Sequence, residues 1–546
     1  MKVLPSSIFR KFFMISLFSV LLAACASEPD EGGGEDAGGE GNEMTEEDGS
    51  ESGEASDGGD LVIATLSDIT GMDPHDSNDV PSSNVQHNVF ETLVIQDENM
   101  ELQPKLAENW EQTGDTTWEF HLRDDVTFHD GAEFNAEAVK ANIDRIQDEE
   151  VASPRAFLYE MVEEVNVIDE YTVEFVTEFP FAPLPAHLAH SGGGIISPEA
   201  IEEDYAAMEN GEQPGDYIND NPHGTGMFKF QEWDSGNEAV LEKNEDYWGD
   251  VPNVDTVTFK VTPEDLTRVG ELEKGQADII FPVSPSDMSR IENTDGMNMY
   301  VQDSLSLEYI SFNIQKEPFD DKKVRQAISM AVDKEAIVEG VMDGAATEAV
   351  GPIGENVFGF SDEVEGLEYN PEQAKDLLAE AGYEDGFSTT LWTNDDRERQ
   401  DIAEVVQQQL KEIGIEVEIE VLEWGAYLDS TAEGEHDMFI LGWSTVTGDA
   451  DYGMYPLFHS DNHGDPGNRS FLENEEIDGV LEEARRAEDE EERKDFYKEA
   501  MELLVEEAPM IYSHHDDYLV GVRDEVKGFW KHPNGIYQLQ NVSIEE

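Results

Sequence analysis

The sequence predicts an α/β fold, and three observations carry this prediction. Residues 61–66 form an unbroken apolar run that is typical of a buried strand. Residues 324–341 and 402–413 repeat apolar side chains at helical spacing, and the second stretch stops at Gly414, a common helix end. Residues 415–421 then alternate apolar and acidic side chains, as a half-exposed strand does. Strands and helices that alternate along a chain build α/β domains.

The composition is strongly acidic, with 126 Asp and Glu against 32 Lys and Arg and a formal net charge of -94 over 546 residues. The length suits roughly three domain-sized units. This charge repels nucleic acid and anionic membrane surfaces, so we expect neither as a partner. It also destabilises a compact state unless salt screens it, which predicts a halophilic protein. A disordered acidic chain is the alternative, but regular apolar periodicity after Leu61 argues against it.

The first sixty residues predict export and anchoring. Residues 1–24 have a basic start and an apolar run too short to span a bilayer, as in a signal peptide. The run ends in Leu22-Ala23-Ala24-Cys25, which resembles a bacterial lipobox, so Cys25 is the predicted lipidation site. Residues 25–60 are rich in Glu, Asp, Gly and Ser and predict a flexible tether.

In chain order, the first predicted elements after the tether are a strand at 61–66, a helix at 83–92 and an alternating strand at 118–122. Asn135 then caps a predicted helix. His129 stands beside Asp130, but adjacent residues at a strand end point different ways, so we interpret the pair as a turn and not as a catalytic dyad.

We interpret two later segments as structural parts of the fold and not as binding sites. Residues 224–230 are a Gly-rich turn into a strand, and the turn lacks the Lys-Ser/Thr of a phosphate loop. Residues 473–505 predict two acidic helices, whose Glu-rich faces we interpret as solvated surface.

The candidate site is the loop 442–452, which follows the apolar strand 438–441. A buried strand fixes the position of the loop after it, which suits binding groups. Asp449 and Asp451 can hold a ligand ammonium, and Trp443 can cover an apolar or planar part of the ligand. The alternative is an acidic turn with Trp443 in the core.

The chain resembles the family 5 extracellular solute-binding proteins of ABC importers. The resemblance covers roughly residues 61–535, and the Gly-Thr-Gly segment has Met227 where the family usually has Pro. The segments that carry it are 104–110, 120–123, 128–131, 224–230, 244–248, 272–278, 312–313, 318–321, 324–328 and 370–382. Residues 134–145, 382–392 and 442–458 are most similar to the glutathione-binding members.

The resemblance implies a two-lobed fold of the periplasmic-binding-protein type (type II, cluster C). Lobe I is expected to comprise residues 61–311 and 513–546, with an extra subdomain at about 101–223. Lobe II is expected to run over 312–512. Ligand binds between such lobes, which close by hinge motion. We expect the hinges near residues 309–313 and 511–515.

The resemblance also implies roles for individual residues. In the peptide-binding relatives an Asp after the Gly-Trp loop holds the ligand's amino terminus, which carries over to Asp449 or Asp451. An Arg holds the carboxylate in dipeptide binders, which points to Arg397, with Arg399 as the neighbour to test. The remaining expected ligand-binding residues are Trp443, Ser444, Thr445 and Trp392, although either Trp is an equally good core residue.

We therefore expect a lipid-anchored binding protein on the outer face of the cell membrane, or in the periplasm. It would be a monomer that delivers short peptides, including glutathione, to a permease and its ATPase, with no enzymatic activity, cofactor or metal. A nickel or metal-chelate binder using residues 514–517 is the first alternative, although consecutive strand residues face opposite ways. An extracellular hydrolase is the second, but no Gly-x-Ser-x-Gly or His-Glu-x-x-His motif supports it.

Overall fold

The computed structural model describes residues 58–465 and 467–545. The predicted signal peptide, the Cys25 lipidation site and nearly all of the predicted tether lie outside the described residues. Strand β1 (Asp60–Thr65) starts one residue before the predicted strand. Among the described residues, no helix has the length and apolarity needed to cross a membrane.

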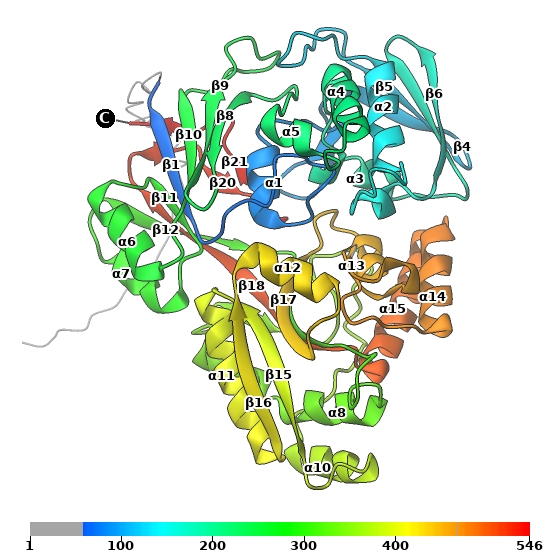
Figure 1. Ribbon diagram of the computed structural model, residues 1–546, viewed down its shortest axis with the longest axis vertical. Coiled ribbons are helices and arrows are strands. Elements are labelled where there is room, and N and C mark those ends of the chain that lie inside the picture. Colours follow the sequence, from blue (N-terminus) through cyan, green and yellow to red (C-terminus); the bar gives the residue numbers. More distant parts are fainter. Residues whose placement is uncertain (1–57, 466, 546) are drawn as a thin grey trace, which may run out of the picture. The chain divides into compact units, whose positions relative to one another are not determined.

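A twelve-stranded sheet organises the described chain and contains both parallel and antiparallel pairs (Figure 1). Its strands are β1, β8 (Phe228–Asp234), β9 (Glu238–Lys243), β10 (Thr256–Val261), β11 (Ile279–Phe281), β12 (Met297–Asp303), β13 (Ser306–Phe312), β14 (Ala346–Glu348), β15 (Phe387–Asn394), β16 (Ile415–Leu422), β17 (Met438–Ser444) and β18 (Met510–Arg523). They follow the order β16-β15-β17-β13-β18-β11-β1-β10-β9-β8, and β12 and β14 pair with β18 off this path.

Strand β18 belongs to both parts of this sheet. Its residues 510–514 pair with β13, whereas residues 517–523 pair with β12. We call β1 and β8–β12 the first half of the sheet, and β13–β17 the second half. The chain crosses between the halves at residues 303–306 and again at residues 514–517, close to the predicted hinges.

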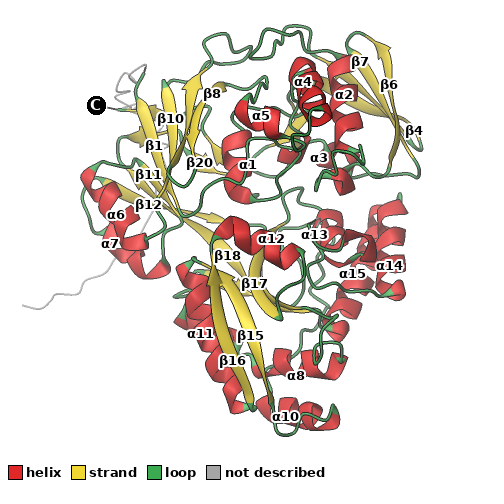
Figure 2. Ribbon diagram, in the orientation of Figure 1, coloured by secondary structure: helices red, strands yellow, loops and turns green. Residues whose placement is uncertain are grey.

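Helices cover both halves (Figure 2). They are α1 (Val80–Gln86), α2 (Ala136–Ile146), α3 (Leu184–His187), α4 (Pro198–Glu209), α5 (Asp216–Asp220), α6 (Asp265–Lys274), α7 (Met288–Glu292), α8 (Lys322–Ala331), α9 (Lys334–Gly340), α10 (Pro371–Glu380), α11 (Arg397–Glu412), α12 (Trp424–Ala432), α13 (Ala450–Phe458), α14 (Glu475–Arg486) and α15 (Glu490–Glu507).

The helix predicted at 402–413 is α11, whose buried Ile402, Val406 and Leu410 share one core with β15 and β16. The stretch predicted as one helix at 324–341 is instead two, α8 and α9. Val332 has extended backbone (φ -94°, ψ 118°), and Asp333 caps α9 by accepting from the Ala336 amide. The Asp333 cap therefore starts a new helix within a stretch whose apolar periodicity predicts one continuous helix.

A second, four-stranded sheet lies within the predicted subdomain at about 101–223. Its order is β4 (Ala107–Gly114), β5 (Thr117–Leu122), β7 (Thr172–Thr177), β6 (Val162–Asp169). Helix α2 packs on it and starts where predicted, because Asn135 accepts from the Ala138 amide at 3.1 Å. Arg145 of α2 is buried between Asp73 (2.6 Å) and Asp204 (2.8 Å), which ties this part to the segment before α1.

Short strand pairs complete the fold, namely β2 (Val94–Gln96) with β3 (Leu102–Pro104), β19 (Val526–Lys527) with β22 (Ser543–Ile544), and β20 (Trp530–Lys531) with β21 (Tyr537–Gln538). The two acidic helices predicted at 473–505 are α14 and α15. His129 and Asp130 bond to different partners, Gly226 and Ser197, as the turn interpretation requires.

Candidate functional site

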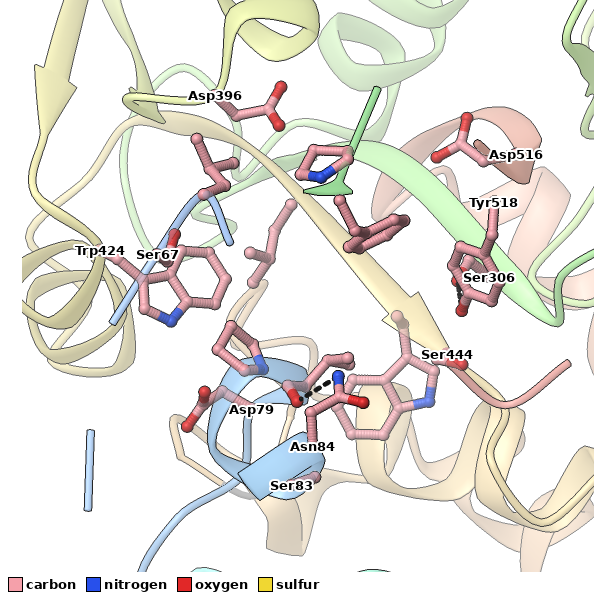
Figure 3. A pocket seen from close by; sticks show the side chains of 18 of the residues that line it. Ser67, Asp79, Ser83, Asn84, Ser306, Asp396, Trp424, Ser444, Asp516 and Tyr518 are labelled. Carbon is pink, nitrogen blue, oxygen red and sulfur yellow. Dashed lines mark hydrogen bonds between the residues drawn. The ribbon is translucent and has the colours of Figure 1, made fainter. Parts of the chain in front are cut away.

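A cavity of about 320 Å³ lies between the two halves of the sheet, beside the crossover in β18. It is lined by the segment after β1, by α1, by the start of α11, by α12 and by the end of β17. Figure 3 shows Asp396 and Asp516 at one end of the cavity, with Asp79 and Asn84 at the other. Segments distant in sequence therefore build one site.

The wall from β17 carries two of the predicted ligand residues. Trp443 and Ser444 both line the cavity. The Trp443 ring stacks on Tyr452 at 5.2 Å and 26°, and its Nε1 donates to the Tyr452 carbonyl at 3.0 Å. These contacts hold the indole in place. Beyond Ser444 the loop presents Val446 to the cavity, so the lining residues of this loop include no carboxylate.

The crossover end of the cavity is acidic. Asp396 caps α11 by accepting from the Arg399 amide at 2.8 Å, and Glu398 lies in the first helical turn. Burial, and then the charge of Asp396, raise the pKa of Glu398 to about 7. Burial also raises the pKa of Asp396, to which the Asp516 charge contributes. These carboxylates repel one another, so a bound cation would reduce the electrostatic repulsion between them.

The arginines of the cavity already have partners. Arg399 donates to both carboxylate oxygens of Glu308, at 2.7 and 3.0 Å. Arg469 pairs with Asp465, and Arg155 bonds to Asn78. The charged lining residues are Asp68, Asp79, Glu308, Asp396, Glu398, Asp465, Asp516 and Asp517 against Arg155, Arg399 and Arg469. The cavity is therefore a net acidic environment that favours a positively charged group.

Asp449 and Asp451 are not among the residues that line the cavity. Asp449 is paired with Arg493 at 2.8 Å and caps α13 by accepting from the Asp451 amide. Asp451 is 1% exposed and pairs with Arg485 at 2.9 Å and with His187 at 3.2 Å. Burial by itself would raise the pKa of Asp451, but the Arg485 and His187 charges outweigh it and lower the pKa.

The other predicted residues also lie off the cavity. Thr445 is buried, and its amide bonds to the Leu305 carbonyl at 2.9 Å. Trp392 packs on the core of the second half, as in the alternative left open above. Arg397 is 47% exposed and faces Asp265 at 3.6 Å, whereas its neighbour Arg399 lines the cavity.

Sequence reasoning missed the acidic end, which consists of Glu308, Asp396, Glu398 and Asp516. The available signal was the pair of predicted hinges, because Glu308 and Asp516 lie beside the two crossovers. His514 and Asp516 of the considered metal motif do meet, at 2.9 Å. His515 instead bonds to the Ser306 carbonyl. Among the described residues, the group assembled with metal-ligand spacing is Glu111, Glu119 and His121, on β4 and β5.

The fold and the cavity between its halves define a two-lobed solute-binding protein. A periplasmic binding protein from Helicobacter pylori, DppA in complex with the peptide STSA, matches with a TM-score of 0.84 and 29% identity over 90% of this chain and 99% of that one. The chain belongs to the bacterial extracellular solute-binding proteins, family 5, whose model matches residues 101–465.

Two relatives share about a third of their residues with this chain. It is 33% identical to the dipeptide-binding protein of Escherichia coli, over 87% of this chain and 91% of that protein. It is 32% identical to the glutathione-binding protein GsiB of Salmonella typhi, over 89% of this chain and 94% of that protein. The predicted family and the predicted two-lobed fold are thus confirmed.

Proposed function

We propose that this chain is the extracellular solute-binding component of an ABC importer and that it captures short peptides for a permease and its ATPase. The family and the peptide complex of the Helicobacter pylori relative support this role. The proposal includes a monomeric binding protein without enzymatic activity, anchored through lipid on Cys25. In this role the lobes enclose the ligand, and the permease distinguishes the closed form from the open one.

The acidic end of the cavity carries the proposal for the ligand's orientation. A peptide brings an ammonium group, and a buried charge needs an opposite one. Glu398, Asp396 and Asp516 supply that charge, and burial together with the Asp396 charge raises the pKa of Glu398. A charge-assisted bond to such a group is worth about 1.5–3 kcal/mol. We therefore place the ligand's amino terminus here and not at Asp449 or Asp451.

The rest of the cavity suits a peptide backbone. Ser67, Ser306 and Ser444 line it with hydroxyl groups. Trp443 and Tyr518 provide aromatic surface for side chains. Polar groups spaced over an aromatic wall allow backbone bonding with little demand on the ligand's sequence. Glutathione, which also carries an ammonium and amides, fits the same description.

Ligand-induced thermal shifts in high salt test the proposal, with di- to pentapeptides, glutathione and nickel as probes. A ligand that binds only the folded protein raises the melting temperature. We expect shifts with peptides that shrink in Glu398→Gln and Asp396→Asn and persist in Asp401→Asn, which removes an exposed charge from the same helix. A shift with nickel alone would overturn the peptide assignment. Recovery of bound peptide intact would exclude a hydrolase.

A further inference from the structure

A chain of polar residues outside the cavity joins the part that holds the four-stranded sheet to the part that follows β17. Glu160, next to β6, and His187 of α3 belong to the part of the molecule that holds the four-stranded sheet. Asp451 of α13 and Arg485 of α14 belong to the part that follows β17. Their side chains meet in the order Glu160, Arg485, Asp451, His187. We call these four residues the latch.

The latch has close contacts and little exposure. Arg485 lies 2.5 Å from the Glu160 carboxylate and 2.9 Å from that of Asp451, and His187 lies 3.2 Å from the other oxygen of Asp451. Arg485, Asp451 and His187 are each at most 4% exposed, whereas Glu160 is 37% exposed. The contact between the two parts thus buries the Arg485 guanidinium, the Asp451 carboxylate and the His187 imidazole.

Tyr452 connects the latch to the cavity. It follows Asp451 directly, lines the cavity, and stacks on Trp443. Its hydroxyl also bonds to Nε2 of His190 at 2.9 Å, and its ring lies 5.9 Å from Phe157. Both of these partners belong to the same part as Glu160 and His187. A ligand that contacts Trp443 and Tyr452 therefore touches Tyr452, whose position the neighbouring latch residues fix.

The opposite flank has a weaker counterpart. Arg397 at the start of α11 faces Asp265 at 3.6 Å and Asp287 at 4.0 Å, and its side chain is 47% exposed. Longer, exposed pairs of this kind add little, because water solvates both partners when they separate. The latch contacts are shorter and more buried than this pair, so removing one latch partner costs more than removing Arg397.

We propose that Glu160, Arg485, Asp451 and His187 form a latch that stabilises the closed form and positions Tyr452 on the cavity wall. The proposal rests on the proposed binding function for its purpose, but its geometry does not depend on the ligand's identity. In the open form Glu160 and His187 separate from Arg485 and Asp451, so the contacts add stability to the closed form alone. An interaction made in one of two states shifts their populations by its full differential free energy.

A distance between spin labels, measured without ligand, tests the latch. Labels at Glu163→Cys on β6 and Glu476→Cys on α14, in a Cys25→Ser background, report the separation of the two parts at exposed sites. Arg485→Lys cannot reach both carboxylates, and Glu160→Gln removes one charge at a half-exposed site. Asp144→Asn is the control, since the Lys140–Asp144 pair lies within α2.

We expect the short-distance population to fall about threefold in Arg485→Lys and to fall less in Glu160→Gln, with no change in Asp144→Asn. Peptide affinity should fall by the same factor as the closed population. An unchanged distance distribution in folded Glu160→Gln and Arg485→Lys would overturn the latch. Changed distances in a protein that binds no peptide would uphold the latch and overturn the proposed function, so the two failures differ.

Discussion

Arg399 of α11 donates two hydrogen bonds to the Glu308 carboxylate of β13, at 2.7 and 3.0 Å, and both residues line the cavity. Their side chains are 15% and 12% exposed. Gly442 of β17 lies against the same pair, and a Cβ at this position would overlap the Glu308 carboxylate. The pair joins β13 to α11, the helix whose first turn carries Glu398, so it fixes these two walls of the cavity relative to each other.

The first prediction concerns this pair. Arg399→Ala leaves the Glu308 carboxylate buried without its partner, and removing one member of a buried pair costs about 3–5 kcal/mol. Denaturant unfolding should show a loss of this order. Lys322→Ala, which breaks the exposed pair with Glu506, is the control and should lose less than about 1 kcal/mol. Equal losses in the two variants would contradict a buried role for Arg399.

The second prediction concerns pH. The pKa of Glu398 is raised from 4.5 to about 7 in the folded protein, chiefly by burial and then by Asp396. The stability that this group contributes is therefore fully present below pH 4.5 and is lost as pH rises through 7. Relative to Glu398→Gln, the natural protein should lose about 2 kcal/mol of unfolding free energy over this window. A pH-independent difference between the two proteins would refute the assignment.

The same titration affects ligand binding. A ligand ammonium binds the ionised carboxylate, so binding releases a proton from Glu398 near neutral pH. Peptide affinity, measured by calorimetry, should rise between pH 6 and 8 in the natural protein. The rise should vanish in Glu398→Gln and remain in Asp401→Asn.

The third prediction distinguishes structural from ligand-binding carboxylates. Asp449 is paired with Arg493, which is 6% exposed, so Asp449→Asn should destabilise the protein by about 3 kcal/mol. The thermal shift produced by a peptide should nevertheless keep its size in this variant. Loss of the peptide shift together with unchanged stability would instead place the ligand's amino terminus at Asp449.

The fourth prediction concerns salt. A formal net charge of -94 makes the compact state repel itself. Raising KCl from about 0.1 M to about 1 M shortens the Debye length from about 10 Å to about 3 Å. The melting temperature should therefore rise by several degrees in calorimetry. The buried pairs are screened much less, so Arg399→Ala should lose a similar free energy at both salt concentrations. A melting temperature that falls with salt would contradict a salt-adapted surface.

Much of the fold was predictable because its patterns are local. Helix α11 and strand β16 follow directly from residues 402–421, since apolar spacing depends on neighbours in sequence. Trp443 and Ser444, two of the predicted ligand residues, lie at the end of β17 and line the cavity, while their role in binding stays a prediction. The break between α8 and α9 was not predicted, because a cap at Asp333 outweighs a continuous apolar pattern.

The sequence by itself determined the α/β class, the family, the acidic composition and the apolar strand β17 that leads into the loop 445–449. Only the tertiary structure decided which carboxylates face the cavity and which are neutralised. Asp451 meets His187 and Arg485, and Glu308 meets Arg399, across separations in sequence that no local pattern records. A carboxylate that pairs with a basic side chain of the protein is not available to a ligand cation. Packing between segments distant in sequence decides which carboxylates form such pairs.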